Sequence, residues 1–66
     1  MASPQETVAE LRAALLALRN APAADKAAAK ARVTTLGAQT AMTMNTNDRK
    51  HFVAGLDNDI ENAMKA

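Results

Sequence analysis

Residues 33–47 read VTTLGAQTAMTMNTN and carry no charged side chain, although charged residues are common on both sides of them. An uncharged run rich in Thr, Ala and Met is better suited to contact another surface than to face water. Strict alternation of apolar and polar residues does not hold over any useful length, so the run is predicted to be helical although Thr slightly favours strands. The predicted helical face has steps of four, three, four and four residues: Ala29, Val33, Leu36, Thr40 and Met44.

Gly37 is the weak point of this predicted helix, because glycine costs about 1 kcal/mol relative to alanine inside a helix. It can mark a kink, a close contact between helices or a break, and a kink or a contact is favoured over a break. Residues 23–31, AADKAAAKA, lie upstream and are strong helix formers that bury little area. Pro22 is compatible with a first helical turn, so the second helix is predicted over 22–44.

The start of the first helix is indicated by Ser3-Pro4-Gln5-Glu6. Ser3 can cap the helix, Pro4 can occupy its first position, and Glu6 can complete a capping box. Large apolar residues then follow with 3-4-3 spacing, and Leu16 widens their stripe. Because the residue before a proline is disfavoured in the α conformation, Ala21 is the expected corner, and the first helix is predicted over 4–19. The stripe consists of Val8, Leu11, Leu15 and Leu18.

A third helix is predicted over 47–64, with Asn45 or Asn47 as its cap and Asp48 in its first turn. Its basic residues come early and its acidic residues late, which is the unfavourable order for a helix dipole. This helix therefore needs tertiary contacts to hold it. Its predicted apolar face consists of Phe52, Val53, Leu56, Ile60, Ala63 and Met64.

The size of the chain limits its core. Residues 1–66 can form one small domain, in which fourteen large apolar side chains follow Met1 and seventeen alanines bury little area. Chains of this size retain a few kcal/mol of stability, and the absence of cysteine excludes a disulfide supplement. We therefore expect an all-α fold, either a small three-helix bundle or a long helical hairpin with the first helix packed across it, supplemented by oligomerisation or docking.

No residue constellation for catalysis is evident, so the chain is predicted not to be an enzyme and to need no cofactor. His51 is the single histidine, and Ser3, the single serine, is assigned to a helix cap. Asp57, Asp59 and Glu61 form D-x-D-x-E, but Asn62 follows where a calcium loop requires glycine. A metal site is therefore not predicted, and these acids are expected to meet basic residues.

The net charge of +1 conceals a basic middle, because Arg12 to Lys50 contains seven basic and two acidic residues. These basic residues could contact phosphate, but the chain has no Tyr or Trp on which bases could stack. If the second and third helices are antiparallel, the two groups of cations lie far apart. Nucleic acid is therefore a less favoured partner than protein. The possible phosphate contacts are Lys26, Lys30, Arg32, Arg49 and Lys50.

The function expected from these features is non-enzymatic and structural. The chain would act through protein contacts, either as a homo-oligomer or as a small accessory subunit of a large assembly, and a bacteriophage virion accessory protein is one class of suitable size and composition. The alternative is a small regulator or inhibitor that binds a protein or nucleic acid. No targeting or membrane segment is visible, so a cytoplasmic location, or one within an assembly formed there, is expected. The predicted interface consists of Val33, Leu36, Gly37, Ala38, Ala41, Met42 and Met44.

Overall fold

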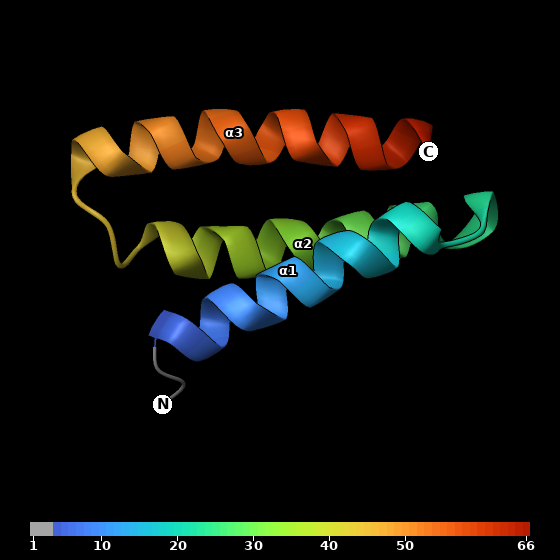
Figure 1. The fold of residues 1–66 in the computed structure, drawn as a ribbon, viewed down its shortest axis with the longest axis horizontal. Helices are drawn as coiled ribbons and strands as arrows, with labels where there is room; N and C mark the ends of the chain where they lie inside the picture. The colour runs from blue at the N-terminus through green and yellow to red at the C-terminus, as the bar shows by residue number, and fades with distance from the viewer. Residues whose placement is uncertain (1–3) are drawn as a thin grey trace.

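The computed structural model describes residues 4–66 and shows a small bundle of three α-helices with no strand in that range (Figure 1). Helix α1 spans Pro4–Asn20, α2 spans Lys26–Ala41 and α3 spans Thr46–Lys65, with a short 3-10 helix, η1, at Ala23–Asp25. Helices α2 and α3 run antiparallel, and α1 crosses α2 at an angle (Figure 1). The all-α prediction of a three-helix bundle is confirmed.

The core is built from the predicted apolar faces of all three helices. Leu18 and Val33 are fully buried, and Ala14 joins the core although its small side chain gave no strong signal in the sequence. Three predicted core residues differ, since Leu16, Val53 and Met64 are exposed on the surface. The buried cluster consists of Leu11, Ala14, Leu18, Val33, Leu36, Leu56, Ile60 and Ala63.

The turn between α1 and α2 is longer than the sequence predicted. Pro22 has an extended backbone with φ −59° and ψ 155°, and the amide of Asp25 donates to the Pro22 carbonyl at 2.9 Å. The tight 3-10 turn that follows delays the start of α2 to Lys26, four residues after the predicted position. The predicted Ser3 cap of the first helix lies outside the described residues.

The predicted end of the second helix at residue 44 is too late, because α2 ends at Ala41. The amide of Met44 donates to the Ala41 carbonyl at 3.1 Å, a three-residue hydrogen bond that tightens the chain into a turn. Asn45 then adopts an extended conformation, and its side-chain oxygen accepts from the Asp48 amide at 2.8 Å. Of the two candidate asparagines, Asn45 caps α3, so that helix begins at Thr46.

Gly37 is a site of close contact between helices, and α2 continues through it to Ala41. Its backbone is buried beneath α3, and a Cβ added at this position would collide with the Cδ2 methyl of Leu56. The absence of a side chain therefore allows α2 and α3 to approach here.

Lys26 is the charged residue in the core, with only 8% of its surface exposed. Its Nζ donates to the carbonyl oxygens of Leu18 at 3.0 Å, Arg19 at 3.3 Å and Ala63 at 3.0 Å. These carbonyls belong to the last turns of α1 and α3, where the dipole favours a cation. The Leu18 and Ala63 carbonyls also accept a backbone N–H, from Ala21 and Ala66, each at 3.3 Å. One side chain at the start of α2 thus links the C-terminal ends of the other two helices.

Candidate interaction surface

The predicted interface residues of the second helix divide into two groups. Val33 and Leu36 lie in the core, and Gly37 and Ala41 are also buried by the chain's own packing. These four residues are therefore already covered within the chain. The remaining three are Ala38 and Met42, which are exposed, and Met44, which is half-buried in the turn after α2. The part of the predicted interface that is open to a partner is therefore narrow.

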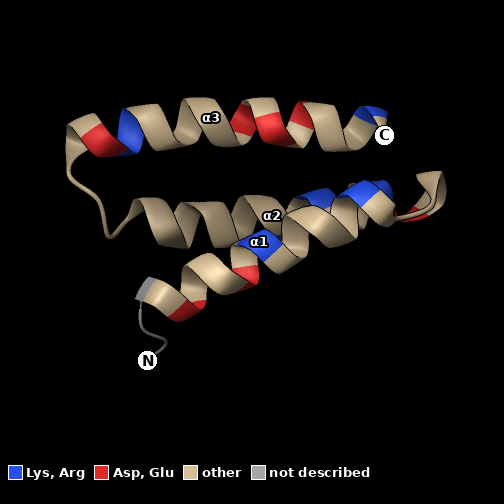
Figure 2. Ribbon diagram, in the orientation of Figure 1, with Lys and Arg blue, Asp and Glu red and all other residues tan. Residues whose placement is uncertain are grey.

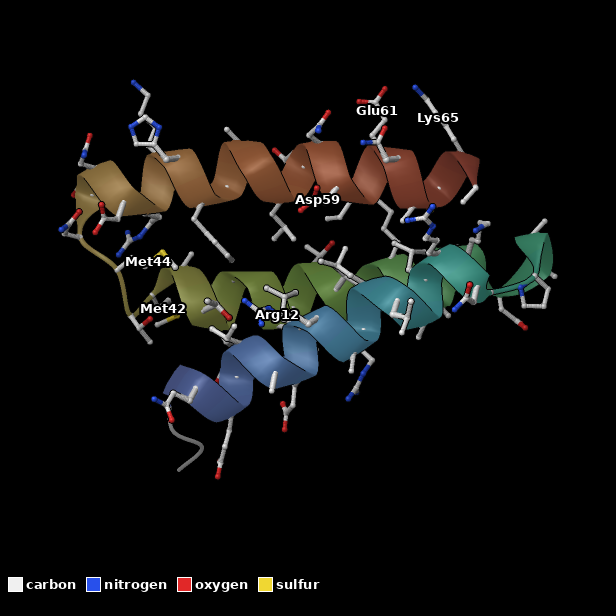
Figure 3. The ribbon with its side chains drawn as sticks, viewed as in Figure 1. Arg12, Met42, Met44, Asp59, Glu61 and Lys65 are labelled. Atoms are coloured by element: carbon white, nitrogen blue, oxygen red, sulfur yellow. The ribbon has the colours of Figure 1, made fainter. Side chains whose placement is uncertain are left out.

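A groove of about 190 Å³ runs between α2 and α3 beside Ala38. Thr34 and Ala38 line it from α2, and Val53 and Asp57 line it from α3. Val53 is 40% exposed at its edge, and Met42 is 79% exposed one turn beyond Ala38. Figure 3 shows Met42 and Met44 at the end of the molecule where α2 turns toward α3. The groove, whose lining is mainly apolar, and Met42 form a surface without a partner in the described chain, which we call the α2–α3 face.

A second groove separates α1 from α3 and has a volume of about 340 Å³. Apolar side chains form its floor, and Phe52 and Leu15 pack partly against the core from its two sides. Polar groups stand along it, namely Arg12 on α1 and His51 and Asp59 on α3. A further hollow shares Leu15 and Asp59 with this groove and continues it toward the C-terminal end of α3. We call this surface the α1–α3 groove.

The five predicted phosphate contacts do not form one surface. Lys26 is buried on three carbonyls, and Arg49 donates to the Ala41 carbonyl at 3.0 Å and to the Met44 carbonyl at 3.1 Å. Both cations are therefore held at helix ends. Lys30 and Arg32 are exposed near one end of the bundle and Lys50 near the other, because α2 and α3 are antiparallel (Figure 2).

The acidic residues and the histidine of α3 are surface groups. No group of three or more His, Asp or Glu side chains is arranged to hold a metal ion within residues 4–66. Glu61 pairs with Lys65 at 3.1 Å within α3 itself, and both side chains are largely exposed. Across the same stretch of chain, no helix is both long enough and apolar enough to cross a membrane.

Searches for similar proteins gave no match to a protein-family model, to a curated protein or to a solved structure.

Sequence reasoning did not identify the α1–α3 groove. A signal for it is present in α3, where Gly55 lies in mid-helix with His51 four residues before it and Asp59 four residues after it. Residues four apart share one side of a helix, so these three positions form a stripe. These three residues are not large and apolar, so the hydrophobic periodicity of the sequence does not reveal the stripe.

Proposed function

We propose that this protein is a non-enzymatic interaction protein that works as a homo-oligomer or as a small accessory subunit of a larger assembly. The contact proposed for this role is the α2–α3 face. Its exposed centre is formed by Ala38, Met42 and Val53.

The observation that carries this proposal is the exposure of Met42. Complete burial of a methionine side chain contributes about 1.5–3 kcal/mol, and 79% of Met42 is exposed to solvent in the single chain. Methionine is also flexible and adapts to irregular partner surfaces. A partner on the α2–α3 face would bury Met42 together with Val53.

The neighbourhood of Met42 supports the same contact. Ala38 is small, and the adjacent Thr34 and Thr35 hydroxyls donate at 3.0 Å to the Lys30 and Ala31 carbonyls of their own helix. These threonines satisfy their hydroxyl protons internally, so their methyl groups can be covered at little cost. Residues 33–42 carry no charged side chain that would have to be desolvated, and Asp57 of α3 is the charged group that lines the groove.

The test is to place a charge on the α2–α3 face and measure the mass of the protein by light scattering. Ala38→Glu and Met42→Glu should each abolish association through this face and lower the mass, while leaving helicity, measured by circular dichroism, nearly unchanged. Ala28→Glu is the matched control, because Ala28 is an exposed alanine near the opposite end of α2. It should leave the mass unchanged. A wild-type chain that is monomeric and well dispersed at high concentration would refute the homo-oligomer and leave docking on a different protein.

A further inference from the structure

The charges of α3 are arranged in blocks that oppose the helix dipole. Asp48 and Lys65 stand at the favourable ends, but Arg49 and Lys50 follow in the N-terminal half. The C-terminal half carries a block of acids at Asp57, Asp59 and Glu61. Figure 2 shows the basic and acidic blocks separated by uncharged turns in the middle of α3. Each block stands near the helix end where its charge is less favourable.

The rest of the chain does little to offset this arrangement. The Glu61–Lys65 pair lies within α3, and no ion pair joins α3 to α1 or α2 in the described part of the chain. Arg49 is occupied by two carbonyls at the end of α2. Lys50, His51 and Asp59 thus remain exposed on α3. An antiparallel helix with the same order of charges would place an acidic block beside each basic one.

Gly55 lies between the two blocks and has no packing role within the single chain. A Cβ added there would meet no heavy atom within 4 Å, in contrast to Gly37, whose Cβ would collide with Leu56. Glycine is unfavourable inside a helix relative to alanine. Glycine lets another backbone approach a helix closely. Within this chain no heavy atom occupies the space beside Gly55, so this part of α3 is open to a helix from outside the chain.

The side of α3 that carries Gly55 opens onto the α1–α3 groove. His51, Gly55 and Asp59 all line this groove, and Phe52 adds apolar surface beside them. Asp59 points from α3 toward the side of the molecule where α1 lies, and Arg12 stands on α1 (Figure 3). His51 and Asp59 are each four residues from Gly55, which makes their positions symmetric about it.

We propose that the occupant of this groove is a second copy of the chain, whose α3 packs antiparallel against the first α3 about a two-fold axis at Gly55. This inference rests on the self-association in the proposed function and adds to the α2–α3 face a second surface through which copies of the chain meet. In such a pair, His51 of each copy faces Asp59 of the other, and the pairing occurs twice because the interface is isologous. The two glycines allow the helix axes to approach closely at the crossing point.

The area required is compatible with the size of the molecule. A standard interface buries about 800 Å² on each partner, which is roughly a sixth of the 4686 Å² surface of this chain. The α3 stripe, the Phe52 edge and the facing wall of α1 would all contribute. Charge complementarity would then fix the antiparallel orientation, since a parallel pair would place like charges together.

The first experiment separates the two effects of a side chain at Gly55. Gly55→Ala should raise the thermal stability of the dilute monomer, because its methyl group meets nothing and alanine favours the helix. The same change should weaken dimerisation by about tenfold or more in analytical ultracentrifugation, because two methyl groups enter the crossing point. Gly55→Leu should abolish the dimer. A Gly55→Ala chain that dimerises as tightly as wild type would overturn the proposal.

The second experiment exchanges the charges that face one another. His51→Asp should weaken the dimer roughly three- to tenfold at low salt, because it places two aspartates opposite each other in both symmetric pairs. Asp59→His should also weaken it. The double variant His51→Asp/Asp59→His restores both pairs and should dimerise within about threefold of wild type. Additive losses in the double variant would show that the two residues do not face each other and would overturn the antiparallel arrangement.

The outcomes for the two surfaces are distinguishable. If Met42→Glu abolishes association and the Gly55 variants do not, the α2–α3 face is the contact and this inference fails alone. If the Gly55 variants abolish association and Met42→Glu does not, the dimer forms through α3, and the α2–α3 face is not needed for self-association. A wild-type chain that is monomeric at all concentrations overturns the inference and leaves docking on a different protein.

Discussion

At the scale of single residues, the ammonium group of Lys26 is the polar centre of the bundle. It donates to three carbonyls from two helices, and hydrogen bonds to charged groups contribute about 1.5–3 kcal/mol. Lys26→Met keeps most of the side-chain volume but removes the charged donor from these three carbonyls, of which Leu18 and Ala63 keep a longer backbone N–H bond at 3.3 Å. We expect the free energy of unfolding in urea to fall by about 2–3 kcal/mol. Lys30→Met, at an exposed position of the same helix, should change it by no more than about 0.5 kcal/mol.

The role of Lys26 could not be predicted from the sequence. It lies between Asp25 and a run of alanines, and its spacing from Lys30 is that of a solvated helix face. The Ala63 carbonyl that it contacts is 37 residues away and belongs to the backbone, which leaves no trace in the side-chain pattern. Arg49 was missed for the same reason, because it also donates to main-chain carbonyls at a helix end. Both residues were interpreted as possible phosphate contacts.

At the scale of the elements, Gly37 sets the distance between α2 and α3. Gly37→Ala gains about 1 kcal/mol in helix propensity, but its methyl group forces Leu56 out of a well-packed position, which costs about 1–3 kcal/mol. We expect a net loss of stability of up to about 2 kcal/mol in chemical denaturation. Gly55→Ala, measured on the dilute monomer, is the matched control and should stabilise. Stabilisation by both changes would contradict the close contact at Gly37.

The helices themselves were predicted from spacing and caps, while two of their ends were not. Apolar steps of three and four residues identified all three helices, and Pro22 and Asn45 marked the turns. The end of α2 at Ala41 was missed because Met44 continues the helical spacing. In the structure, hydrogen bonds of the turn and Arg49 hold residues 42–44 outside the helix. Periodicity alone does not distinguish a residue of the last turn from one just beyond it.

At the scale of the whole molecule, the proposed contacts predict that stability depends on concentration. If folded chains associate, mass action stabilises the folded state, and a hundredfold rise in concentration contributes up to about 2.7 kcal/mol. We expect the melting temperature of the wild type to rise by several degrees over that range in calorimetry. A chain that carries both Met42→Glu and Gly55→Leu lacks both surfaces and should melt at a constant temperature. A constant melting temperature in the wild type would contradict self-association.

The sequence predicted only part of the candidate interaction surface. Of the uncharged run, Ala38 and Met42 are exposed, but Val33 and Leu36 form part of the core. The absence of charge is common to buried and to unpartnered faces, so composition cannot separate them. The α1–α3 groove depends on how α1 crosses α2 (Figure 1), and that angle is set by packing among all three helices.

The position of Lys26 also has a consequence for local opening of the chain. One ammonium group donates to the last turns of both α1 and α3. When either turn loosens, the buried ammonium group loses an acceptor, and its hydrogen bonds are then incomplete. Fraying at these two helix ends is therefore thermodynamically linked, although the ends lie far apart in the sequence. The amide hydrogens of the two turns would exchange with solvent as parts of one cooperative unit rather than independently.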